Sequence, residues 1–193
     1  MNSDFLNSVQ IAHQTIPWNH IIIDDFLPSV EFAEVQKQLC AIKTGYLKLE
    51  DDIFALNYMF LPHLNLAKLF LSDEFANFLG TITNTQVSIN EKNLVQLRLM
   101  NSESPGLPPH TDDSDTNSLA VLYYLSPNST EDRGGDLILH PDEFNTALDK
   151  STVVRPKANR LVIFSANEKN WHSVSKVENW NRFTITSQWT IES

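Results

Sequence analysis

The hydrophobic positions of the first half of the chain repeat mostly at helical spacing. Residues 29–43 place Phe32, Val35, Leu39 and Ile42 on one face, which predicts an amphipathic helix with Ser29 or its neighbour as the N-cap. Residues 61–83 predict one or two further helices, with Gly80 near the end. The β-branched run 20–28, ended by a proline, predicts a short strand.

From about residue 93 the apolar positions alternate with period two. Seven strand-like runs are separated by turn-rich segments: 93–100, 118–126, 134–140, 152–156, 160–166, 171–177 and 182–191. Many short strands of this kind indicate a sandwich or barrel. We therefore expect a single α+β domain over 1–193. In it, residues 1–92 form a helical support region and residues 93–193 form a mainly antiparallel β core.

Charge and composition narrow the classes of partner. The formal net charge is −10, with 24 acidic and 14 basic residues and no basic cluster, which argues against a nucleic-acid partner. No run approaches the ~20 apolar residues of a membrane span. The lone cysteine, Cys40, lies in a helical pattern and predicts core packing. Without a disulfide pair or leader pattern, we expect a cytoplasmic protein, and a monomer or a weak dimer fits the sequence equally well.

One short motif suggests a metal site. His110 and Asp112, in "LPPHTDDSD", are two residues apart, so their side chains point to the same face of an extended segment. His172 lies in a later strand-like run and supplies a third candidate ligand. Two histidines and one carboxylate form the donor set of non-haem Fe(II) oxygenases. The neighbouring Asp113 and Asp115 are expected to be solvated loop charges.

An arginine follows the distal histidine by ten residues. Arg182 opens the strand-like run 182–191, and Thr184 shares its face. The alternate positions of this run are apolar, which predicts a largely buried strand, and a buried arginine needs an anionic partner. The planar guanidinium, with a hydroxyl beside it, suits a carboxylate.

These residues together resemble the Fe(II)/2-oxoglutarate-dependent dioxygenases, in particular their prolyl-4-hydroxylase-like branch. The resemblance covers about residues 93–191 and includes "VLYYLS" followed by "GGDLILH"; the opening "HIIIDDFLPSVEFAEVQKQL" is also similar. It implies a double-stranded β-helix, the jelly-roll core of cupin-like proteins, packed on the N-terminal helices. The implied cofactors are Fe(II), 2-oxoglutarate as co-substrate and O2, with ascorbate as a further candidate.

The resemblance also implies roles for individual residues. His110, Asp112 and His172 would bind Fe(II) and act as the catalytic centre, while Arg182 and Tyr124 would hold the C5 carboxylate of 2-oxoglutarate. Three further residues belong to the implied co-substrate pocket: Thr184 as an assisting hydroxyl, and Leu137 and Val174 as walls. Plain core packing is an alternative for the two walls.

The sequence departs from the family pattern ten residues before His110. Relatives often carry a tyrosine there, whereas this chain has Met100, which donates no hydrogen bond. Gln96, Arg98 and Met100 share one face of the run 93–100, so we expect that face to point into the barrel mouth, where Gln96 and Arg98 would contact substrate or co-substrate. A solvated position for Arg98 is the alternative.

Three functions remain open from the sequence. The first is a hydroxylase that acts on an unactivated C–H bond, of peptidyl proline or of an amino-acid-like small molecule, with release of succinate and CO2. The second is a cupin-type metal-binding isomerase or a non-catalytic ligand sensor. The third is a family member that binds ligand without turnover, for which Met100 is the only support. The segments expected to border the entrance are 44–60, 101–109 and 126–133.

Overall fold

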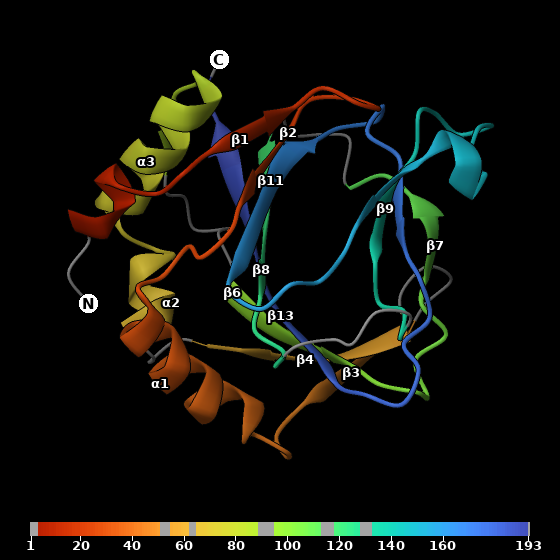
Figure 1. The fold of residues 1–193 in the computed structure, drawn as a ribbon, viewed down its shortest axis with the longest axis horizontal. Helices are drawn as coiled ribbons and strands as arrows, with labels where there is room; N and C mark the ends of the chain where they lie inside the picture. The colour runs from red at the N-terminus through yellow and green to blue at the C-terminus, as the bar shows by residue number, and fades with distance from the viewer. Residues whose placement is uncertain are drawn as a thin grey trace.

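The computed structural model describes residues 4–50, 55–61, 65–88, 95–112, 118–127 and 133–192. They form two facing sheets with helices on one side (Figure 1). The larger sheet has the order β1 (Ala12–Gln14), β2 (His20–Ile23), β11 (Arg160–Ala166), β8 (Ser118–Tyr124), β13 (Arg182–Ile191), β6 (Val95–Met100), β4 (Ala55–Phe60), β3 (Leu47–Glu50), and β5 (Val87–Ser88) also pairs with β13. The smaller sheet has the order β10 (Thr152–Val154), β9 (Leu137–Leu139), β12 (His172–Val174), β7 (Leu107–His110).

The helices cover the outer face of the larger sheet. They are α1 (Ser29–Cys40), α2 (Asn65–Leu69) and α3 (Asp73–Thr83). The chain also has two short 3-10 turns: η1 (Asp4–Asn7), and η2 (Leu148–Lys150), which lies on the side of the smaller sheet. Figure 1 shows α1 to α3 on one side of the larger sheet and β7 and β9 on the other. No helix among the described residues is both long and apolar enough to cross a membrane.

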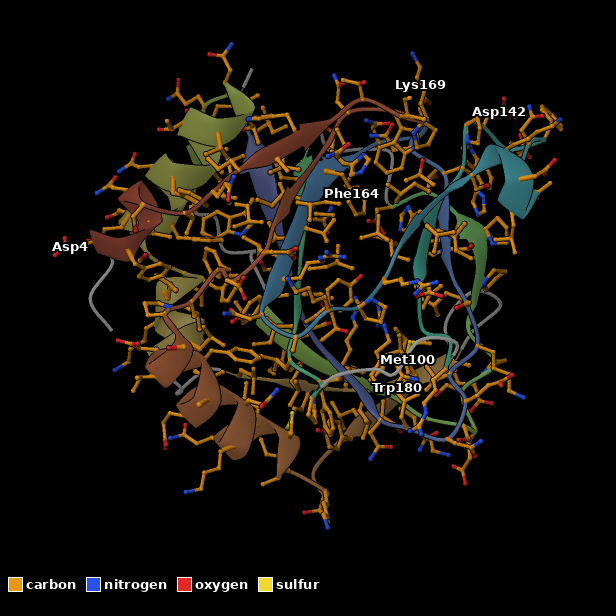
Figure 2. The ribbon with its side chains drawn as sticks, viewed as in Figure 1. Asp4, Met100, Asp142, Phe164, Lys169 and Trp180 are labelled. Carbon is orange, nitrogen blue, oxygen red and sulfur yellow. The ribbon has the colours of Figure 1, made fainter. Side chains whose placement is uncertain are left out.

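Strand alternation divides the buried side chains into two cores. The helix-side core, between the helices and the larger sheet, includes Phe75, Tyr123 and Trp189. The inter-sheet core lies between the two sheets and includes Phe164 and Met100 (Figure 2). Each fully buried large apolar side chain contributes about 1.5–3 kcal/mol. Successive residues of a strand in the larger sheet therefore point alternately into the helix-side core and into the space between the two sheets.

The predicted fold class, a mainly β jelly-roll core on N-terminal helices, is confirmed by this architecture. The first 92 residues do more than support the core, because β1 to β5 all join the larger sheet. The segment 44–60, expected as a border of the entrance, contains the paired strands β3 and β4. Of the segment 126–133, residues 128–132 lie outside the described part of the chain.

Both predicted helix signals lie close to where the sequence places them: the N-cap of α1 is next to Ser29, and Gly80 is in the last turn of α3. The N-cap of α1 is Pro28, and no side chain caps that end; the fixed φ of proline, here −52°, prepares the chain for the first turn. Gly80 lies within α3, whose C-cap is Asn84 in the left-handed conformation. A Cβ on Gly80 would lie 2.8 Å from the Thr85 carbonyl oxygen, so close chain approach explains this glycine.

Candidate functional site

Two histidines face each other across the smaller sheet. His110, at the end of β7, is the register partner of His172, at the start of β12. Their ring centroids are 4.4 Å apart. The Nδ1 atom of His110 donates to the Pro108 carbonyl at 2.7 Å, and that of His172 donates to the Asn170 carbonyl at 3.0 Å. These bonds fix both tautomers with the lone pair on Nε2, the arrangement in which histidine binds a metal.

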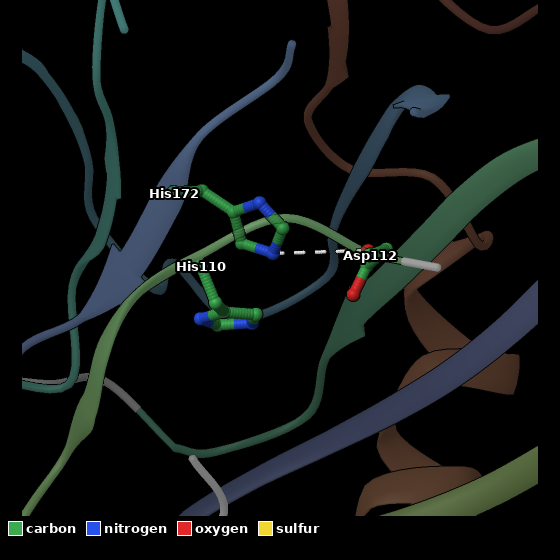
Figure 3. Close-up of side chains that lie close together, drawn as sticks. All are labelled: His110, Asp112 and His172. Carbon is green, nitrogen blue, oxygen red and sulfur yellow. Dashed lines mark ion pairs between the residues drawn. The ribbon is translucent and has the colours of Figure 1, made fainter. Parts of the chain in front are cut away.

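Asp112 completes a group of three candidate ligands (Figure 3). Its Oδ2 atom lies 3.7 Å from Nε2 of His172, and the ligand atoms of His110, Asp112 and His172 all lie within 4.8 Å of one another. The two histidines are buried and the aspartate is half-buried. One divalent cation can therefore contact all three. Asp113 and Asp115 lie outside the described residues.

The surroundings favour the neutral form of His110. Burial lowers the pKa of this imidazole, and the neighbouring His172 lowers it further. The Pro108 carbonyl and the Asp112 carboxylate oppose this effect but do not reverse it. Metal binding requires a neutral imidazole, so the environment prepares His110 for that role.

A second group of polar atoms lies in the larger sheet, close to the inter-sheet core. Tyr124 and Thr184 are register partners on β8 and β13, and Arg182 is two residues before Thr184. All three side chains are buried, and the Tyr124 hydroxyl, the Thr184 hydroxyl and Nη2 of Arg182 find no hydrogen-bond partner within the described part of the chain. Burial raises the pKa of the Tyr124 hydroxyl, so it remains a protonated donor. Three unmatched donors beside one another suit a buried carboxylate.

Two contacts hold the Arg182 guanidinium in place. Nε donates to the Gly135 carbonyl at 2.8 Å, and Nη1 donates to the Met100 sulfur at 3.6 Å. Met100 is the register partner of Arg182 and is fully buried. Its thioether is a weak acceptor, so it orients the arginine while neutralising little of its charge.

A cavity of about 170 Å³ connects the candidate ligands to the larger sheet. It is lined by His110, Asp112 and His172, by the predicted walls Leu137 and Val174, and by Gln96 and Arg98. Arg182, Tyr124, Thr184 and Met100 do not line it; they lie next to its wall, because Thr184 is the register partner of Arg98. The expected division of β6 is confirmed, since Val95 and Leu97 join the helix-side core and Met100 joins the inter-sheet core.

The sequence interpretation missed two aromatic residues beside this cavity. On β4, Tyr58 is the register partner of Arg98, and Phe60 is the register partner of Gln96. Their rings lie 5.6 Å apart, edge to face. The alternation of "ALNYMF" is the sequence signal that identifies this segment as a strand of the sheet and places both rings on one face.

His140 and Cys40 have structural surroundings. His140 contacts the Ser151 and Ser173 hydroxyls through its two ring nitrogens, each at 2.8 Å. His63 lies outside the described residues. Burial raises the pKa of the Cys40 thiol to about 11, which keeps it protonated and unreactive.

Comparison with known proteins identifies relatives of the chain. A family model described as the 2OG-Fe(II) oxygenase superfamily matches residues 95–190. A curated relative, the prolyl 3-hydroxylase OGFOD1 of Mus musculus, is 24% identical over 189 residues, which cover 91% of this chain and 33% of that protein. The chain therefore spans about a third of the length of the curated relatives it matches.

Solved structures share the fold. A prolyl-4-hydroxylase from Pseudomonas putida superposes with a TM-score of 0.67 at 16% identity, covering 99% of this chain and 97% of that one. A prolyl hydroxylase from Trichoplax adhaerens, in complex with a hypoxia inducible factor oxygen degradation domain peptide fragment, gives a TM-score of 0.61 at 22% identity. That match covers 98% of this chain and 86% of the other. At these identities the likeness establishes the architecture.

Proposed function

Because the chain belongs to the 2OG-Fe(II) oxygenase superfamily, we propose that it is an Fe(II)- and 2-oxoglutarate-dependent hydroxylase. One observation carries the proposal. Three metal-ligating side chains, His110, Asp112 and His172, meet at a cavity whose wall adjoins three unmatched buried donors of Tyr124, Arg182 and Thr184. The first group suits Fe(II), and the second suits the far carboxylate of 2-oxoglutarate.

In this proposal the metal ligands are His110, Asp112 and His172. Bound iron and 2-oxoglutarate would supply the oxidising chemistry with O2 as the oxidant: one oxygen atom of O2 converts a C–H bond to an alcohol, and the other enters succinate as 2-oxoglutarate loses CO2. The chain orients the ligands through the Pro108 and Asn170 carbonyls, which hold both imidazole rings.

The co-substrate site is formed by the larger sheet. Arg182 would pair with the C5 carboxylate, Tyr124 and Thr184 would donate their hydroxyls to it, and Leu137 and Val174 would wall the pocket. The donors are already buried and oriented, so little further ordering is required when the carboxylate binds. Met100 contributes through its contact with Arg182, rather than through a bond of its own to 2-oxoglutarate.

The substrate would enter the cavity along Gln96 and Arg98. We propose peptidyl proline or an amino-acid-like small molecule as its class. The Trichoplax relative was solved with a peptide fragment, which supports a peptide. The Tyr58 and Phe60 rings, beside Arg98 and Gln96 in the register, provide an aromatic surface for an aliphatic or prolyl ring. A cytoplasmic location, the oligomeric state and the use of ascorbate stay predictions.

The direct test is succinate formation by the purified chain. Incubation with Fe(II), 2-oxoglutarate and air should yield succinate, and omission of either cofactor, or the change His172→Ala, should abolish it. A panel of proline-containing peptides and free amino acids is then screened by mass spectrometry for a gain of one oxygen atom. If no condition yields iron-dependent succinate while the chain binds both cofactors, the hydroxylase proposal is wrong.

A further inference from the structure

An exposed apolar face continues the inner side of the larger sheet beyond the cavity. On β4, Tyr58 and Phe60 alternate in phase with Leu56, a member of the inter-sheet core, so all three side chains point to the inner side of the sheet. On β3, Leu47 is the register partner of Tyr58 and therefore shares this side. We call the side chains of Leu47, Tyr58 and Phe60 the β3–β4 face.

The β3–β4 face is accessible to a ligand. Leu47 is 53% exposed and Phe60 is 44% exposed, while Tyr58 is half-buried. The two aromatic rings lie edge to face with their centroids 5.6 Å apart, so each ring restricts the movement of the other. Exposed apolar side chains that adjoin one another in this way are typical of a surface that another molecule covers.

The β3–β4 face borders the cavity along β6. Phe60 is the register partner of Gln96, which lines the cavity. Tyr58 is the register partner of Arg98, which lines it as well. Neighbouring strands lie about 4.8 Å apart, and an extended chain advances about 3.3 Å per residue. A peptide with one residue in the cavity therefore reaches the β3–β4 face with the next one or two residues of its chain.

The size of the cavity limits what it can hold. Its volume is about 170 Å³, whereas sites that enclose a drug-sized ligand measure about 300–1,000 Å³. The cavity therefore fits one ring or side chain of a substrate, and the rest of a longer substrate must lie outside it. A free amino acid would leave the β3–β4 face uncovered, whereas a peptide would cover it with a neighbouring side chain.

Charge argues against a second copy of the chain as the occupant of this face. The formal net charge is −10, so two copies of the chain repel one another. Leu47, Tyr58 and Phe60 carry no charge and offer no partner to an ionised group. An uncharged apolar side chain of a substrate meets neither obstacle, and its burial against the face is favourable.

Resting on the proposed function, we propose that the substrate is a peptide with an uncharged apolar residue, such as leucine, next to a proline. The proline enters the cavity, and the neighbouring apolar side chain packs on Leu47, Tyr58 and Phe60. These three residues determine specificity for the segment around the reacting residue and take no part in cofactor binding. A free amino acid lacks the side chain that this face recognises.

The test is a binding titration that needs no turnover. The full chain is loaded with Mn(II) and 2-oxoglutarate without oxygen, and three probes are added in an isothermal titration calorimeter. They are acetyl-Ser-Leu-Pro-Leu-Ser-amide, its counterpart acetyl-Ser-Asn-Pro-Asn-Ser-amide, and free L-proline. Phe60→Ser and Leu47→Ser are compared with two matched controls, Phe144→Ser and Leu148→Ser. Both control side chains are exposed, and neither lines the cavity.

We expect the leucine peptide to bind the wild type about tenfold or more tightly than the asparagine peptide, and more tightly than free proline. Phe60→Ser and Leu47→Ser should each weaken binding of the leucine peptide about threefold or more, and should change binding of the asparagine peptide less than about twofold. The two control variants should keep the wild-type preference. In every variant 2-oxoglutarate should bind within about threefold of the wild-type affinity, which also verifies folding.

Three results would overturn the inference and leave the proposed function intact. One is a wild type that binds 2-oxoglutarate but binds the two peptides equally, binds neither, or prefers free proline. Another is a leucine preference that Phe60→Ser and Leu47→Ser both keep, or that the controls lose to the same extent. The third is a dimeric wild type, measured by light scattering, that becomes monomeric in Phe60→Ser, since the face would then bind a second copy. A wild type that binds Mn(II) but not 2-oxoglutarate overturns the proposed function itself, together with this inference.

Discussion

The guanidinium carbon of Arg182 lies 5.1 Å from the centre of the Tyr124 ring. Both side chains are buried, and each has a polar atom without a partner among the described residues: Nη2 of the arginine and the hydroxyl of the tyrosine. Buried polar groups are normally hydrogen-bonded, so the two atoms suit a ligand that offers acceptor oxygens to both. This relationship leads to the first two predictions.

Arg182→Gln should weaken 2-oxoglutarate binding by about 10- to 100-fold, because it removes a charge-assisted contact with a carboxylate. Calorimetry on the Mn(II)-loaded chain without oxygen measures this directly. Arg160→Gln, which removes an arginine paired with Asp24, should leave the affinity unchanged. Equal losses in both variants would contradict the assignment of Arg182.

Removal of the hydroxyl group from Tyr124 should affect 2-oxoglutarate binding, whereas its removal from the adjacent Tyr123 should affect stability. Tyr124→Phe should weaken 2-oxoglutarate binding severalfold without loss of stability, since the lost hydroxyl has no described partner. Tyr123→Phe should leave binding unchanged and lower the free energy of unfolding by about 1 kcal/mol, because the Tyr123 hydroxyl donates to Asn159 at 2.7 Å. Ligand titration and urea unfolding of both variants separate the effects.

Asp112→Ala should reduce metal affinity at least about a hundredfold, because it removes one of three ligands. Asp113→Ala is the control, and its metal affinity and succinate formation should match the wild type. Titration with Mn(II), followed by electron paramagnetic resonance, reports binding without turnover. Similar behaviour of the two variants would show that this interpretation of the loop is wrong.

Gly135→Ala should displace the side chain of Arg182, whereas the matched change Gly45→Ala should not. Gly135 has φ +80° and a new Cβ would lie 2.9 Å from Cδ of Arg182, whereas Gly45 has φ +85° with its nearest neighbour at 3.8 Å. Both changes cost about 1 kcal/mol or more of backbone strain, but only the first displaces the guanidinium. Gly135→Ala should therefore weaken 2-oxoglutarate binding, and Gly45→Ala should not.

The stability that Asp24 contributes should depend on pH. Arg160, and more weakly Lys157, lowers the pKa of this carboxyl, which binds Arg160 at 2.7 and 3.0 Å. The pKa of this carboxyl is lower in the folded protein than in the unfolded chain, where it is near 3.8, so the ionised carboxyl stabilises the fold at pH values above about 3.8. This stabilisation is lost as the pH falls below that value and through the folded-state pKa. Because Asp24 is over a third exposed, Asp24→Asn should cost only about 0.5–1 kcal/mol at pH 7.

Urea unfolding of the wild type and Asp24→Asn at pH 7, and again near pH 3, measures the difference. The gap between the two proteins should shrink at the lower pH as the wild-type carboxyl becomes protonated. An unchanged gap would mean that lost packing, rather than the ion pair, accounts for the destabilisation.

The alternation of side chains along each strand allowed much of the candidate site to be predicted from the sequence. The i, i+2 spacing of His110 and Asp112 and the period-two pattern of 182–191 assign side chains to faces without knowledge of the fold. The same pattern placed Gln96, Arg98 and Met100 on one face of β6, as the structure has them. Local features were predicted less fully: the pattern does not show that α1 begins without a side-chain cap, or that a close chain approach requires Gly80.

The sequence by itself determined which residue types are present and which of them share a face of each strand. It also carried the resemblance to a known family. Only the tertiary structure decided which strands lie side by side. The pairing of His172 with His110, of Tyr124 with Thr184 and of Tyr58 with Arg98 joins residues distant in the chain. Strand order depends on how the sheets and helices bury their apolar faces together, and a local pattern does not specify that arrangement.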